Sequence, residues 1–206
     1  MINEKKTDID MLTYEKKAKE AGYNIVCGVD EAGRGPLCGP VVAAAVILKD
    51  SVNIEGINDS KKLTEKKREK LYDEIINNVE AYGIGIVDVD VIEEINILNA
   101  TKKAMLDAVE NLNLTPDVVL IDGNQKINTN IPQKTIVSGD ALSKSIAAAS
   151  ILAKVTRDRM LIEYDKKYPE YGFAKHKGYG TKMHIESIKK YGLTPIHRCS
   201  FCKKIV

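Results

Sequence analysis

The sequence predicts an α/β fold in which helices cover both faces of a five-stranded mixed sheet. Two strand-like apolar runs, residues 24–30 and 41–48, lie near the start of the chain and predict an antiparallel beginning to the sheet. Beyond them strand-type and helix-type segments alternate, which predicts parallel strands at the other end. The run at 41–48 is small and apolar throughout, as expected of a central strand covered on both faces.

Glycine and proline separate the first elements. A short helix over residues 10–21 stops at Gly22, and the first strand follows over residues 24–30. A loop, Gly33-Arg-Gly-Pro36, then leads to Pro40, which opens the second strand.

The middle of the chain alternates between helix and strand. Apolar side chains recur at helical spacing over residues 64–78, and residues 81–87 alternate enough to form the third strand. Residues 89–112 are helical, with Asn96 and Asn99 as interruptions or caps.

Two short strands and two helices complete the prediction. Residues 118–121 and 133–137 form the fourth and fifth strands. A long helix over residues 141–165 is rich in alanine and serine, whose small side chains permit close approach to the sheet. A last helix covers residues 182–191.

The composition is that of an ordinary globular domain, and it disfavours a membrane protein. With 44% hydrophobic and 29% charged residues and a net charge of +2, the chain is neither membrane-like nor polybasic. The longest strongly apolar run is too short to cross a bilayer, and residues 1–6 are polar with no signal-type segment after them. We therefore expect a cytoplasmic monomer with no membrane partner, in which the four cysteines are free thiols.

Two local patterns leave alternatives open. Basic clusters such as Lys66-Lys67-Arg68 fit a phosphate-lined partner, but they fit solvated helix faces equally well. Cys199 and Cys202 have the spacing of a zinc knuckle, yet a structural zinc site normally needs four nitrogen or sulfur ligands. We predict no zinc site.

Four carboxylates stand at the ends of predicted strands. Asp30 and Glu31 close the first strand, Asp122 follows the fourth and Asp140 follows the fifth. The ligand crevice of an open α/β sheet lies outside the carboxyl ends of its strands, so we expect these side chains to converge. Converging carboxylates repel one another unless cations are present. Mg²⁺ suits such oxygen ligands, and two divalent ions could activate a water and stabilise the leaving oxygen of a phosphodiester.

Each acid also has a structural interpretation. Asp140 is a good N-cap for the helix that follows, and Asp122 before Gly123 is a plausible turn residue. Neither a turn nor a cap requires the adjacent pair Asp30 and Glu31. Successive strand residues point to opposite faces, so this pair serves one site only through a local kink or a main-chain carbonyl.

Several long motifs occur in one order along the chain, from about residue 24 to Phe201. They resemble bacterial type 2 ribonuclease H (ribonuclease HII), and the arginine of Gly33-Arg34-Gly35 favours this type over type HIII, which has a lysine there. Cys38 departs from the family, which often has alanine at that position. The motifs are Val29–Val46, Asp59-Ser-Lys-Lys-Leu63, Ile121-Asp-Gly123, Gly139-Asp140 with Ser145–Asp158, and Lys177-Gly-Tyr-Gly-Thr181 with His184.

The resemblance implies a ribonuclease H-like catalytic domain over residues 24–206 behind a helical extension, residues 1–23. It implies hydrolysis of the RNA strand of RNA–DNA hybrids, and cleavage 5′ of single ribonucleotides in duplex DNA to give 3′-hydroxyl and 5′-phosphate ends. The implied catalytic residues, which hold two Mg²⁺ or Mn²⁺ ions, are Asp30, Glu31, Asp122 and Asp140. The implied nucleic-acid-binding residues are Gly33, Arg34, Gly35, Ser60, Lys61 and Tyr179.

The loop fits its implied role, since glycines let main-chain N–H groups approach a ligand closely and the 2′-hydroxyl distinguishes RNA from DNA. The loop is no dinucleotide-binding motif, because its glycine spacing differs and Pro36 interrupts the required helix start. A DNA nuclease or strand-transfer enzyme of the same fold, and a non-catalytic hybrid-binding module, remain alternatives. We expect His184 and His197 to be capping or packing residues.

Overall fold

The computed structural model describes residues 10–50, 54–57 and 63–206 and contains one five-stranded sheet. Its strand order is β3-β2-β1-β4-β5. Strand β1 pairs antiparallel with β2 and β2 with β3, whereas β1–β4 and β4–β5 are parallel. The strands are β1 Val26–Ala32, β2 Val41–Ile47, β3 Ala81–Val87, β4 Val118–Asp122 and β5 Gln133–Ile136.

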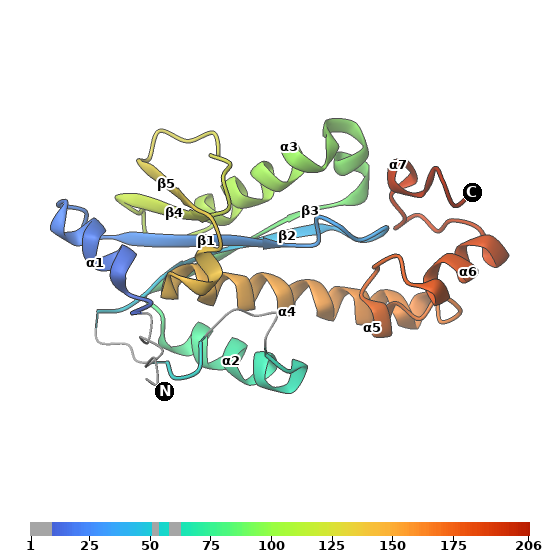
Figure 1. Ribbon diagram of the computed structural model, residues 1–206, viewed down its shortest axis with the longest axis horizontal. Helices are drawn as coiled ribbons and strands as arrows, with labels where there is room; N and C mark the ends of the chain where they lie inside the picture. Colours follow the sequence, from blue (N-terminus) through green and yellow to red (C-terminus); the bar gives the residue numbers. More distant parts are fainter. Residues whose placement is uncertain (1–9, 51–53, 58–62) are drawn as a thin grey trace, which may run out of the picture.

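Helices cover both faces of the sheet, which confirms the predicted fold class (Figure 1). Helix α3 packs on one face, while α4, with α2 beside it, packs on the other. Helices α5, α6 and α7 gather at one end of the molecule (Figure 1). The α-helices are α1 Thr13–Glu20, α2 Glu65–Asn78, α3 Val89–Glu110, α4 Lys144–Lys167, α5 Phe173–His176, α6 Lys182–Tyr191 and α7 Cys199–Cys202.

Close helix–sheet packing depends on glycine in β1. A Cβ atom at Gly28 would lie 2.3 Å from the main-chain carbon of Ser145, so no larger residue fits beneath the start of α4. The alanine-rich part of α4 is buried and packs against the sheet, which confirms the predicted close approach. None of the described helices is long and apolar enough to cross a bilayer.

The structure changes two predicted boundaries. Strand β1 continues to Ala32, because antiparallel pairing with β2 extends through Glu31 and Ala32. Helix α4 begins only at Lys144, where the Ser143 hydroxyl caps it, and Asp140 lies in a preceding 3₁₀ turn, Gly139–Ala141. The N-cap interpretation of Asp140 is therefore wrong.

The two asparagines of α3 have different roles. Asn96 interrupts the helix with φ 66°, and its side-chain oxygen accepts hydrogen bonds from the N–H groups of Leu98 and Asn99. Asn96 thus caps a second helical segment that begins after it, and Asn99 lies within that segment. The short helices α5 and α7 were not predicted, because four residues are too few to show helical periodicity.

Candidate active site

Asp30 and Glu31 lie within strand β1, on opposite faces of the sheet. Both belong to a regular antiparallel ladder, in which Asp30 pairs with Ala44 and Glu31 with Ala43. Asp30 is buried and bonds to Ser150 of α4, whereas Glu31 is partly exposed and its Oε1 accepts from Arg34 Nη1 at 3.3 Å. Pairing between β1 and β4 ends at Val29, so no strand covers the β4 side of these two acids within the described sheet.

Asp122 links the end of β4 to the turn that carries Asp140. Its Oδ1 accepts hydrogen bonds from the main-chain N–H groups of Gly139, at 2.6 Å, and of Asp140, at 3.4 Å. These hydrogen bonds come from residues 17 and 18 positions further along the chain. Asp122 therefore does more than form a local turn with Gly123.

Electrostatic repulsion connects the two acidic groups. Burial, the charge of Glu31 and the charge of Asp122 all raise the pKa of Asp30 well above its ordinary value of 3.8. The four predicted carboxylates therefore lie in one region, although no three of them within the described residues bring their oxygens within 4.8 Å of one another. Their function as metal ligands stays a prediction.

Two buried arginines hold the Gly33–Pro40 loop, and within the described part of the chain neither guanidinium bonds to a carboxylate. The guanidinium of Arg198 donates to the carbonyls of Gly33, Arg34, Pro36 and Gly39 at 2.7–3.1 Å. That of Arg157 donates to the carbonyls of Cys38, Pro40 and Lys177 at 2.9–3.0 Å. Two distant parts of the chain, α4 and the C-terminal segment, thus fix the shape of the loop.

The Arg198 contacts orient two peptide groups of the loop. In a trans peptide the N–H points opposite to the carbonyl that precedes it. Since the carbonyls of Gly33 and Arg34 face Arg198, the N–H groups of Arg34 and Gly35 face away from it. Both residues are exposed, and neither N–H donates to another described residue. The loop therefore presents two adjacent donors at the surface.

Tyr179 lies beside this loop. A Cβ atom at Gly35 would lie 3.8 Å from Cε1 of Tyr179, and this tyrosine is 48% exposed. The N–H of Leu37 donates to the carbonyl of Gly178 at 2.8 Å, which joins the two segments directly. The structure therefore brings Gly33, Arg34, Gly35 and Tyr179 together, whereas the predicted residues Ser60 and Lys61 lie outside the described residues.

The family model described as ribonuclease HII matches residues 27–204. The chain belongs to the ribonuclease HII family. A ribonuclease HII from Acetivibrio thermocellus is 64% identical over 198 residues, covering 96% of this chain and 77% of that protein. One from Caldicellulosiruptor bescii is 56% identical over 199 residues, 97% of each. The crystal structure of ribonuclease H2 from Pyrococcus horikoshii has a TM-score of 0.74 and 31% identity, covering 88% of this chain and 97% of that one.

These comparisons confirm the resemblance and the ribonuclease H-like fold. The protein is a ribonuclease H, a hydrolase that acts on phosphodiester bonds. A cavity of about 660 Å³ lies at the other end of β1, where Asn24 and Ile25 line it, and none of the predicted site residues lines it. The candidate site is instead the open edge where the acids, the Gly33–Pro40 loop and Tyr179 lie.

Sequence reasoning missed the two arginines of this ribonuclease. Arg157 lies within the mostly buried helix α4, and Arg198 follows His197, a predicted packing residue. A charged residue within or beside a segment that is expected to be buried was the signal that could have indicated both arginines. A buried charge without a carboxylate partner usually serves a dense set of hydrogen bonds. That inference requires knowledge of burial, which the sequence does not provide.

Gly33 of this ribonuclease combines a left-handed conformation with a close approach. Its φ is +99°, and a Cβ atom there would lie 2.2 Å from Nε of Arg157. We expect Gly33→Ala to lower the free energy of unfolding by about 3 kcal/mol or more, through strain and displacement of the arginine. Urea unfolding measures this loss. Gly22→Ala is a matched control, because Gly22 has φ +94° and open space around it, so we expect only about 1 kcal/mol. Equal losses in the two variants would contradict the predicted clash.

His184 and His197 give this ribonuclease a pH-dependent stability. Burial is the main cause that lowers the pKa of each to about 4, from an ordinary value of 6.5. The unfolded chain therefore binds more protons than the folded one between about pH 6.5 and 4, and stability falls as the pH falls through that window. We expect a loss on the order of 2 kcal/mol per histidine between pH 7 and 5. Urea unfolding at both pH values tests this, and equal midpoints would contradict it.

Proposed function

We propose that this ribonuclease hydrolyses the RNA strand of RNA–DNA hybrids and cuts on the 5′ side of single ribonucleotides embedded in duplex DNA, giving 3′-hydroxyl and 5′-phosphate ends. The observation that carries the proposal is the juxtaposition of two outward-facing N–H donors, at Arg34 and Gly35, with the ring of Tyr179. Adjacent donors suit a ribose 2′-hydroxyl, which is the group that distinguishes RNA from DNA. The exposed ring offers a surface on which a nucleotide can stack.

The acids supply the second half of the proposal. Asp30, Glu31, Asp122 and Asp140 would hold two Mg²⁺ or Mn²⁺ ions, and their oxygen donors fit such hard cations. The raised pKa of Asp30 supports this assignment, since a divalent cation would relieve the repulsion that Glu31 and Asp122 exert on it. When bound, the ions would activate a water and stabilise the leaving oxygen.

The protein's own residues supply position and selectivity in this proposal. Arg198 and Arg157 hold the loop rigid, so little order has to be gained when a duplex binds. The Gly139 and Asp140 N–H groups hold one oxygen of Asp122 and so fix the orientation of its carboxylate. Glu31 leaves β1 on the face opposite Asp30, so it would reach the same ions past the end of the β1–β4 pairing or through its main-chain carbonyl.

A duplex with one ribonucleotide, an all-deoxy duplex of the same sequence and an RNA–DNA hybrid test the proposal together. With Mn²⁺ or Mg²⁺ we expect cleavage of the first and third substrates only, at the 5′ side of the ribonucleotide, and no cleavage after chelation with EDTA. Cleavage of the all-deoxy duplex would favour a DNA nuclease. Tight binding without cleavage, unaffected by EDTA, would favour a hybrid-binding module.

A further inference from the structure

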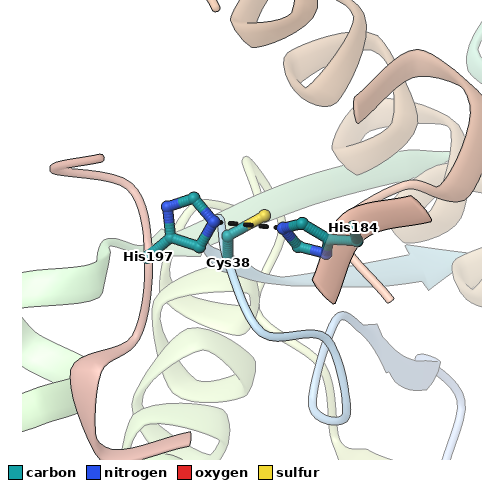
Figure 2. Close-up of side chains that lie close together, drawn as sticks. All are labelled: Cys38, His184 and His197. Carbon is teal, nitrogen blue, oxygen red and sulfur yellow. Dashed lines mark hydrogen bonds between the residues drawn. The ribbon is translucent and has the colours of Figure 1, made fainter. Parts of the chain in front are cut away.

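A buried cluster joins Cys38 of the Gly33–Pro40 loop to His184 and His197. Their ligand-type atoms all lie within 4.8 Å of one another, a spacing that would suit a metal ion (Figure 2). The rings of the two histidines face each other across a hydrogen bond of 3.0 Å between their Nε2 atoms, and the sulfur of Cys38 lies beside that bond (Figure 2).

The hydrogen bonds argue against a metal at this cluster. The main-chain N–H of Thr194 donates to Nδ1 of His197 at 2.9 Å, so the proton of the neutral ring is on Nε2. A protonated Nε2 offers no lone pair to a metal. Burial also raises the pKa of the Cys38 thiol to about 12, whereas a metal ligand must be a thiolate.

The hydrogen bonds of the two histidine rings all run in one donor-to-acceptor direction. His197 Nε2–H donates to Nε2 of His184, which therefore carries its proton on Nδ1. That Nδ1–H donates to the carbonyl of Tyr179 at 3.0 Å. The chain of bonds thus runs from the main chain at Thr194, through both rings, to the main chain of the tyrosine predicted to contact the nucleic acid.

The third histidine supports the arrangement from the side. His176 Nδ1 accepts from the N–H of Gly178 at 3.1 Å, and its Nε2–H donates to the carbonyl of Tyr171 at 2.9 Å. Its ring stacks on His184 with centroids 4.3 Å apart and an interplanar angle of 16°. The N–H of Tyr179 donates to the carbonyl of His176 at 2.9 Å. Both main-chain polar groups of Tyr179 therefore bond to this histidine layer, and its carbonyl also accepts from the N–H of Thr181 at 2.8 Å.

We propose that His184 and His197 are positioning residues that act through the main chain of Tyr179 and keep its ring beside Gly35. This inference rests on the proposed function, in which that ring contacts the ribonucleotide. Packing alone would require only an apolar side chain at residue 184. A directed hydrogen bond from the His184 ring, in addition to the one from the Thr181 N–H, instead restricts the orientation of the Tyr179 carbonyl and so of the residue that carries the exposed ring.

Two substitutions separate positioning from packing. His184→Asn places an amide N–H near the position of Nδ1 and keeps a donor for the carbonyl of Tyr179. In His184→Gln the side chain reaches toward His197 and loses that donor, while it fills more of the space that the His184 ring occupies. We expect kcat/KM on the single-ribonucleotide duplex to stay within about threefold of wild type for His184→Asn and to fall about tenfold or more for His184→Gln. Thermal stability should show the opposite order, because asparagine leaves the larger void.

A double-mutant cycle shows whether the histidine acts through the tyrosine. In a Tyr179→Ala background we expect His184→Gln to change kcat/KM by less than about twofold. An equal loss in both backgrounds would overturn the inference, as would higher activity of His184→Gln than of His184→Asn. Failure of the wild type to cut this duplex would overturn the proposed function instead.

Nitrogen NMR tests the hydrogen-bond chain without any substrate. The chain has three histidines, so their signals can be assigned by substitution. At pH 7 we expect three neutral rings, with the proton on Nδ1 in His184 and on Nε2 in His176 and His197. The ring signals of Tyr179 should move in His184→Gln and stay in His184→Asn. Another set of tautomers, or no movement in His184→Gln, would overturn the inference whatever the enzyme cleaves.

Discussion

Replacing Asp30 by asparagine is expected to raise the stability of this ribonuclease and to abolish its activity. The carboxylate is buried and lies beside the charges of Glu31 and Asp122, so the folded protein is destabilised when Asp30 ionises. Asparagine keeps the shape and removes the charge. We expect a gain on the order of 1–3 kcal/mol at neutral pH and a fall in kcat of at least about 10³-fold, since the variant would lose a proposed metal ligand.

The pH dependence of the gain follows from the raised pKa of Asp30. The unfolded carboxyl ionises above its ordinary pKa of 3.8, whereas the folded one remains protonated to higher pH. Wild type therefore loses stability relative to Asp30→Asn as the pH rises from about 4, and the two converge below it. Thermal melts from pH 4 to 8, with and without Mg²⁺, measure the difference.

Two controls make the Asp30 result specific. Asp73→Asn, an exposed position on α2, should change neither stability nor activity. Mg²⁺ should raise the melting temperature of wild type more than that of Asp30→Asn, because in the proposed function it binds the folded site through Asp30. A destabilised Asp30→Asn would contradict the electrostatic argument. An Asp30→Asn variant with full activity would contradict the assignment of Asp30 to the site.

Arg198→Lys should be the most damaging conservative substitution in the C-terminal segment. Lysine keeps the charge but concentrates its donors on one atom, so it cannot serve the carbonyls of Gly33, Arg34, Pro36 and Gly39 together. Each buried carbonyl left without a donor costs about 1–3 kcal/mol. We expect a loss of about 3 kcal/mol in unfolding free energy, or about 6–12 °C in melting temperature, and about 10²-fold in kcat/KM.

Arg159→Lys is the matched control for this substitution. Arg159 lies in α4, where it is exposed and bonds to Glu69. An exposed ion pair contributes little, so we expect a change below about 1 kcal/mol and unchanged cleavage. Similar losses for the two arginine variants would show that the loop does not depend on the buried guanidinium.

Local patterns in the sequence were enough to predict most of the secondary structure. Small-apolar and alternating runs marked the strands, and the interruption at Asn96 was predicted because its side chain competes with the helix backbone. The resemblance pointed to the acids, the glycine loop and Tyr179 because its motifs are contiguous. The predicted division at residue 23, and the two residues outside the described ranges, stay predictions.

Long-range contacts could not be predicted in this way. Whether β1 stops at Asp30 or continues to Ala32 depends on the length of its partner β2. The burial of Arg157 and Arg198 depends on carbonyls more than 100 residues away. No local pattern contains that information.

Periodicity and motif identity are local properties of a chain, so the residues were enough to predict the five strands, the longer helices, the family and the chemical types of the candidate site residues. Three features became known only from the packed fold: which way the peptides of the loop face, on which side of the sheet Glu31 lies, and the layer of three histidines behind Tyr179. These features are set by hydrogen bonds and burial between segments distant in sequence, which exist only after the sheet and its helices have packed.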